Sequence, residues 1–133
     1  MPWRNDAPIH YVDESIYSKV LVQAVRSAGV AVEHVGVAVP FGAKDEDWLE
    51  MCGRNGWVAL TRDQRIRYRQ LEKQALKDFS VGAFTFTAGM ATAQQTASRV
   101  VELLPILHSR ARDTTRPFLF TFGLLGPVSR VKL

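Results

Sequence analysis

The sequence predicts an α/β fold, in which helices cover both faces of a mainly parallel β-sheet. Short apolar, β-branched runs alternate along the chain with segments whose apolar residues recur at helical spacing. The run WVALT is continuously apolar, which is typical of a strand covered on both faces. No internal repeat or linker interrupts the 133 residues, so one domain, 1–133, is expected.

The amino-terminal half predicts three strands separated by two helices. In chain order, strand, helix, strand, helix and strand are expected at 9–13, 15–30, 30–39, 45–53 and 57–61. The first helix has apolar residues at helical spacing, and Gly29 is suited to its carboxyl-terminal cap. The second strand is rich in valine and ends at Pro40, which breaks the pattern. The second helix begins with acidic residues, which favour the positive end of its dipole.

The carboxyl-terminal half predicts two more helices and three more strands. Helix, strand, helix, strand and strand are expected at 71–79, 81–87, 90–113, 117–123 and 128–133, with a bend in the long helix at Pro105. Phe118, Phe120 and Phe122 alternate along one strand and therefore share one of its faces. That face is either core or the contact surface of a homodimer, and the alternation favours core.

Acidic residues follow the predicted strands or begin the predicted helices. Asp13 and Glu14 follow the first strand, Asp45 and Asp47 open the second helix, and Asp63 follows the third strand. Each could be a helix cap or a turn residue. Ligands of parallel sheets, however, bind outside the carboxyl ends of the strands, where these acids are expected to meet. A pocket of carboxylate oxygens prefers Mg²⁺ or Mn²⁺, which would activate water for attack on a phosphodiester.

A basic segment follows the last of these acids. Arg62, Arg65, Arg67 and Arg69 crowd it, and Tyr68 lies among them. The arginines form a solvated face, bind RNA phosphates beside the acids, or pair with an acidic partner protein. Tyr68 could stack on a base, because aromatic residues among arginines are common in single-strand recognition.

Composition is typical of a soluble protein of the cytoplasm. The net charge of +4 and the isoelectric point near 9.6 are compatible with nucleic-acid binding. Cys52 is the single cysteine, so no disulfide forms within the chain. No apolar run reaches the ~18 residues of a membrane helix, and the amino terminus lacks a secretory signal. His10, His34 and His108 share no metal-ligand spacing, and structural roles are expected for them.

The segments YVDES and DEDWLEMCGRNGWVALTRD resemble PIN-like domains, in particular the short toxin group related to VapC. The resemblance covers about residues 8 to 87. It implies a three-layer α/β/α fold and a metal-dependent ribonuclease that acts as the toxin of a toxin–antitoxin module, with a cognate antitoxin as partner. By motif position it implies that Asp13, Asp45 and Asp63 hold Mg²⁺ or Mn²⁺, supported by the hydroxyl of Thr61.

The chain departs from longer PIN-like domains in one respect. Those carry a glutamate on a helix inserted between the first and second acids, and the interval here is too short for such an insertion. Glu14 could take the place of that glutamate, and Asp47 is the other additional ligand candidate.

Two rival functions remain open at this point. One is a non-catalytic module that binds nucleic acid or protein on the same fold. The other is a receiver-like phosphoacceptor domain, because Asp13, Glu14 and Asp63 fit its acidic spacing. The arginines after Asp63 argue against a receiver. A receiver also has a lysine after its fifth strand, and here that lysine is missing unless Lys132 serves. Metal binding by the acids would separate the nuclease from the non-catalytic module.

Overall fold

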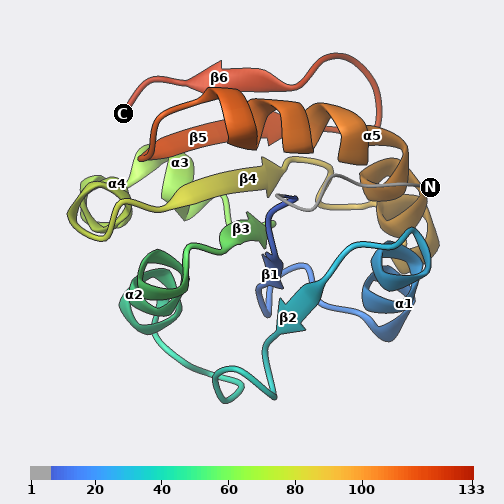
Figure 1. The fold of residues 1–133 in the computed structure, drawn as a ribbon, viewed down its shortest axis with the longest axis horizontal. Coiled ribbons are helices and arrows are strands. Elements are labelled where there is room, and N and C mark those ends of the chain that lie inside the picture. Colours follow the sequence, from blue (N-terminus) through green and yellow to red (C-terminus); the bar gives the residue numbers. More distant parts are fainter. Residues whose placement is uncertain (1–6) are drawn as a thin grey trace.

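A computed structural model of the protein describes residues 7–133, in which six strands form one sheet (Figure 1). The strands are β1 (His10–Val12), β2 (Val32–His34), β3 (Val58–Thr61), β4 (Gly82–Phe86), β5 (Phe118–Phe122) and β6 (Ser129–Val131). Their spatial order is β2-β1-β3-β4-β5-β6. Every neighbouring pair is parallel except β5 and β6, which pair antiparallel. The predicted mainly parallel sheet is therefore confirmed.

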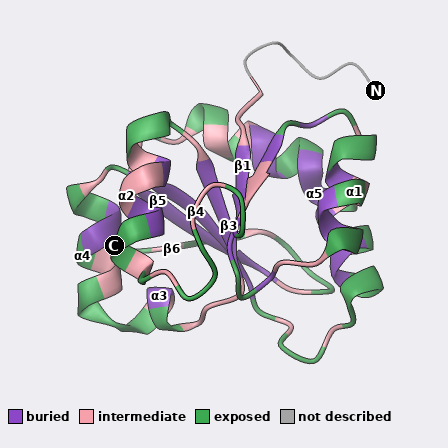
Figure 2. Ribbon diagram, turned by 90° about the horizontal axis from the view of Figure 1, so that it is seen from below, coloured by how far each residue is buried: buried purple, intermediate pink, exposed green. Residues whose placement is uncertain are grey.

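Five helices connect the strands. They are α1 (Lys19–Ser27), α2 (Asp45–Asn55), α3 (Arg65–Tyr68), α4 (Gln70–Asp78) and α5 (Ala93–Asp113). Helices α1 and α5 lie on one side of the sheet, and α2 and α4 lie on the other (Figure 2). This arrangement is the three-layer α/β/α architecture that the alternation of strands and helices predicts.

Two hydrophobic cores follow from the alternation of side chains along the strands. Val12 of β1 faces the core beneath α1 and α5, whereas its neighbour Tyr11 faces the core beneath α2 and α4. Phe118, Phe120 and Phe122 are all buried in the first of these cores. The interpretation of these phenylalanines as core is thus confirmed. Cys52 is a buried free thiol in the second core.

The structure shortens the predicted first helix and second strand and adds one helix. The second strand ends at His34, because the chain turns at Gly36, whose φ of +91° is in the left-handed region that favours glycine. The basic segment contains the four-residue helix α3, which the sequence did not predict. Pro105 lies inside α5 on its exposed side, and α5 continues through it as one helix. Within residues 7–133, no helix is long and apolar enough to cross a membrane.

The parallel register brings the ends of β1 and β3 together. Val12 pairs with Leu60, and the backbone N–H of Asp13 donates to the carbonyl oxygen of Leu60 at 3.0 Å. Asp13 therefore leaves β1 beside the point where β3 ends, two residues before Asp63. The amino terminus of α2 approaches the same edge, so three segments distant in sequence meet there.

Candidate functional site

A pocket of about 240 Å³ lies at the carboxyl ends of β1 and β3. Its lining residues are Asp13, Glu14, Ser15, Gly42, Ala43, Asp45, Trp48, Asp63 and Arg65. The three acids expected to converge thus line one cavity, although they come from the ends of two strands and the start of a helix. Carboxylate oxygens from such rigid elements can hold a hard cation or orient a polar ligand.

Asp13 is the most enclosed of these acids, with 6% of its surface exposed. Its Oδ2 accepts hydrogen bonds from the hydroxyl groups of Ser15, at 2.7 Å, and Thr61, at 2.9 Å. The fully buried Thr61 also accepts from the backbone N–H of Asp63 at 3.0 Å. One hydroxyl thereby fixes the carboxylate after β1 and the backbone after β3 at the same time.

Asp45 is the first residue of α2 and is oriented by the indole of Trp48. Trp48 Nε1 donates to Asp45 Oδ1 at 3.1 Å, which directs the carboxylate back toward the sheet. Burial raises the pKa of Asp45, and the nearby charges of Asp63 and Asp13 act in the same direction, while the Trp48 hydrogen bond opposes them. The positive charge of Arg65 also opposes the rise in the pKa of Asp45.

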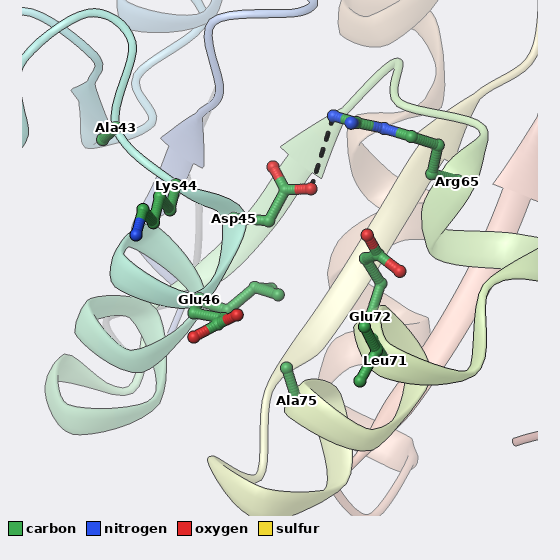
Figure 3. A pocket seen from close by; sticks show the side chains of 9 residues that line it. Ala43, Lys44, Asp45, Glu46, Arg65, Leu71, Glu72 and Ala75 are labelled. Carbon is green, nitrogen blue, oxygen red and sulfur yellow. Dashed lines mark ion pairs between the residues drawn. The ribbon is translucent and has the colours of Figure 1, made fainter.

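Asp63 is paired with Arg65 two residues further along the chain. The guanidinium approaches both carboxylate oxygens, with Nε at 2.9 Å from Oδ1 and Nη2 at 2.6 Å from Oδ2. Burial alone would raise the pKa of Asp63, but these hydrogen bonds and the charge of Arg65 outweigh it and hold the pKa below its usual value. The same Nη2 lies 3.4 Å from Asp45 Oδ2 (Figure 3). Arg65 therefore pairs with both acids.

The additional ligand candidates lie in different surroundings. Glu14 is exposed at the pocket, and its Oε1 accepts from the backbone N–H of Gly42 at 2.6 Å. Asp47 is exposed on the first turn of α2 and does not line the pocket. Glu14 is therefore placed to contribute oxygen at the site, and Asp47 is not brought to it.

The arginines of the basic segment point in different directions because α3 is helical. Arg62 is turned inward, where its Nη2 donates to Thr96 at 2.7 Å and its guanidinium lies 5.4 Å from the ring centre of Phe86. The guanidinium of Arg67 lies over the ring of Tyr68 at 5.0 Å, and Tyr68 is 71% exposed. Arg69 is exposed. Arg69 therefore carries the positive charge that is most open to solvent, and Arg67 is half-buried.

Sequence reasoning missed several residues of the site. Ser15 follows Asp13 by two positions. An aspartate side chain commonly accepts a hydrogen bond from the backbone two residues ahead, so this spacing could have identified Ser15. Trp48 occupies a helical stripe and looked like a core residue. The pairing of Arg65 with two acids depends on the unpredicted helix α3, so no sequence signal identified it.

The donor set suits Mg²⁺ or Mn²⁺, since both prefer carboxylate oxygen. Within residues 7–133, however, no group of three or more His, Cys, Asp or Glu side chains is arranged to hold a metal ion. The guanidinium of Arg65 pairs with oxygens of Asp63 and Asp45 that a cation would use. The carboxylates are thus of the chemical type that binds these ions, and the guanidinium of Arg65 pairs with two of them.

Comparisons with known proteins agree with the fold. The model of the family described as "PIN like domain" matches residues 8–88, a range that includes all three acids and Thr61. A protein of Mycobacterium tuberculosis named "Putative ribonuclease VapC45" is 27% identical over 115 residues, which cover 84% of this chain and 83% of that protein. No solved structure matches the chain.

Proposed function

Since the chain belongs to the PIN-like domain family, we propose that it is a metal-dependent endoribonuclease. The observation that carries the proposal is that Asp13, Asp45 and Asp63 line one pocket while coming from three separate segments. The name of the mycobacterial relative, a ribonuclease, supports RNA as the substrate. The receiver-like alternative loses its support, because the matching family is a different one.

In this proposal, Asp13, Asp45 and Asp63 hold Mg²⁺ or Mn²⁺, and Glu14 is a further oxygen donor at the rim. The bound ion supplies a water of lowered pKa and stabilises negative charge on the phosphodiester. Thr61 and Ser15 fix the orientation of Asp13 through their hydroxyl groups, and Trp48 fixes that of Asp45. The carboxylates are thereby arranged before the substrate arrives, which is the main contribution a protein makes to such chemistry.

Binding of the RNA backbone is assigned to the cations beside the pocket. Arg67 and Arg69 belong to the segment that follows Asp63, and the exposed ring of Tyr68 offers a stacking surface for a base. Arg62 is engaged with Thr96 and Phe86, so it supports the segment from within and has a smaller part in phosphate contact.

We extend the proposal to the toxin of a toxin–antitoxin module that acts in the cytoplasm, with a cognate antitoxin as its partner. Support comes from the VapC name of a relative that aligns over most of both chains. We expect a reading frame for a small DNA-binding protein next to the gene of this chain. We also expect that small protein to form a stable complex with this chain. If the gene has no such neighbour and the protein cleaves RNA without harm to the cell, the toxin–antitoxin role is wrong and the ribonuclease activity stands.

The nuclease proposal is tested by substitution of the acids. Asp13→Ala and Asp63→Asn should each lower cleavage of total RNA by about 10²-fold or more, the scale on which loss of one preorganised electrostatic group acts. EDTA should abolish cleavage by the unmodified protein. The control is Asp78→Asn, which removes an exposed acid of α4 far from the pocket and should cleave normally.

Calorimetry with Mn²⁺ provides the independent measurement. The unmodified protein should bind the ion, and Asp63→Asn should bind it weakly or not at all while melting at a similar temperature. Equal Mn²⁺ binding and equal cleavage by both proteins would contradict the proposal and favour the non-catalytic module.

A further inference from the structure

Arg65 is placed where a bound cation would compete with it. Its guanidinium contacts both oxygens of Asp63, and its Nη2 also lies 3.4 Å from Asp45 Oδ2. The backbone N–H of Arg65 donates to Asp63 Oδ1 at 3.0 Å, so the pair is held from the main chain as well. One positive side chain thus neutralises two acids that belong to different elements.

We propose that Arg65 is the resident counterion of the acid pocket, which pairs with Asp63 and Asp45 in the metal-free protein and has to move away before a divalent cation binds. The inference rests on the metal site proposed above and concerns how that site is loaded. In this proposal, a charge carried by the chain itself, without a second protein, holds the acids in their observed geometry.

The competition follows from the shared oxygens. A Mg²⁺ ion bonds its oxygen ligands at about 2.0–2.1 Å, a distance that leaves no room for a guanidinium hydrogen-bonded along the same lone pairs. Two positive groups on one carboxylate pair would also repel each other strongly at this separation. An ion shared by Asp45 and Asp63 and the observed position of Arg65 are therefore mutually exclusive.

Arg65 is also free to leave. Its side chain is 52% exposed, whereas the side chains of Asp63 and Asp45 are 13% and 24% exposed. Arg65 is therefore the more exposed partner in both pairs, and its guanidinium has solvent to rotate into. Arg62 offers a contrast, because its guanidinium is fixed against Thr96 and the ring of Phe86.

A counterion also explains how the pocket stays folded without metal. Asp13, Asp45 and Asp63 line one small cavity, and unbalanced carboxylates at such spacing repel each other. Within residues 7–133, both salt bridges made by these acids use Arg65. Its positive charge keeps the acids in place until the ion replaces it.

The test is calorimetric titration of Mn²⁺ into the full chain and three variants at one pH and ionic strength. Arg65→Ala and Arg65→Gln should bind Mn²⁺ about fivefold or more tightly than the unmodified protein, because the ion no longer displaces a charge-assisted pair. Arg69→Ala is the matched control. It removes an exposed positive charge that acts on Asp63 without an ion pair to it, and it should change the affinity by about twofold or less, since exposed charges are screened.

A second readout follows Arg65 directly in the unmodified protein. The Nε–Hε resonance of Arg65, assigned through its bonded side-chain and backbone nuclei in the isotope-labelled unmodified protein, should move toward the position of a solvent-exposed arginine when Mg²⁺ saturates the site. This measurement decides the matter even if a variant folds poorly.

The outcomes separate the two proposals. If the unmodified protein binds Mn²⁺ but the Arg65 variants bind it no more tightly than Arg69→Ala, the counterion role is wrong and the metal site stands. An Arg65 resonance that does not respond to saturating Mg²⁺ has the same meaning. If neither the unmodified protein nor the Arg65 variants bind Mn²⁺, the metal site itself is overturned.

Discussion

Two neighbouring threonines show how a single hydroxyl can matter in opposite ways. Thr61 and Thr85 are paired in register on β3 and β4, and both are fully buried. The hydroxyl of Thr61 bonds Asp13 and the backbone N–H of Asp63. The hydroxyl of Thr85 has no hydrogen-bond partner among the residues that the structure describes. The same replacement at the two positions should therefore have different consequences.

Thr61→Val should lower the free energy of unfolding by about 1–3 kcal/mol, because it leaves the buried Asp13 with one donor fewer and the N–H of Asp63 without its acceptor. The measurement is urea unfolding at neutral pH. If the proposed function holds, RNA cleavage should fall as well, whereas Thr61→Ser, which keeps the hydroxyl, should retain most of it.

Thr85→Val is the matched control and should be neutral or stabilising by about 1 kcal/mol, since it removes a buried hydroxyl that forms no hydrogen bond. Equal effects of both replacements on the free energy of unfolding would mean that the hydrogen bonds of the Thr61 hydroxyl do not stabilise the protein. The assignment of Thr61 as the support of Asp13 would then fail.

At the scale of elements, the close approach of α2 and α4 sets where Asp45 lies. Gly53 is inside α2, and a Cβ at this position would collide with the carbonyl oxygen of Phe79 at the end of α4. The absence of a side chain lets α2 pack tightly against α4 and the sheet. The amino terminus of α2, which carries Asp45, is thereby held at the carboxyl edge of the strands.

Gly53→Ala should destabilise the protein by about 1–3 kcal/mol, because the added methyl group forces α2 away from α4. Helix propensity alone predicts the reverse, a gain of about 1 kcal/mol. Chemical unfolding decides between the two. Gly89→Ala is the control, since a Cβ there meets nothing within 4 Å. A Gly53→Ala protein as stable as the unmodified one would show that this contact is loose.

The elements that the sequence predicted well are those with a clear period. Continuous apolar runs at β3 and β4 and helical stripes at α2 and α5 follow from burial on one face or two. The second strand was overextended, because its valines continue past the turn at Gly36. Helix α3 was missed because only Ile66 of its four residues is buried, which leaves no apolar stripe to detect.

The candidate site divides in the same way. The common pocket of Asp13 and Asp63 could be predicted, since the carboxyl ends of parallel strands share one edge. The direction of each arginine could not, because it depends on where α3 begins and on partners such as Thr96 that lie far along the chain. Charge counting identified the basic segment but not that Arg65 turns back onto the acids.

At the scale of the whole molecule, a histidine pair joins the first strand to the long helix at the end of the sheet opposite the acids. Nε2 of His10, in β1, lies 3.0 Å from Nε2 of His108, in α5, and the rings stack at 5.1 Å. Burial lowers the pKa of His10 to about 3, and the neighbouring His108 acts in the same direction. Burial also lowers the pKa of His108. His10 of the folded protein is therefore neutral at any pH well above 3.

This pair makes stability depend on pH in a defined direction. Below the ordinary histidine pKa of 6.5, the unfolded chain binds a proton at His10 that the folded protein does not, until the pH reaches about 3. The free energy of unfolding is therefore fully retained above pH 6.5 and falls as the pH drops below it, by about 1.4 kcal/mol per pH unit for one histidine.

Urea unfolding at pH 7.5 and pH 5 measures this effect. Between these two pH values, the free energy of unfolding should fall by about 2 kcal/mol more in the unmodified protein than in His10→Gln, whose amide does not titrate in this range. His34→Gln, at a half-buried histidine of β2, is the control and should keep the steep dependence. Identical pH dependence in the unmodified protein and His10→Gln would show that β1 and α5 are not joined through a neutral histidine pair.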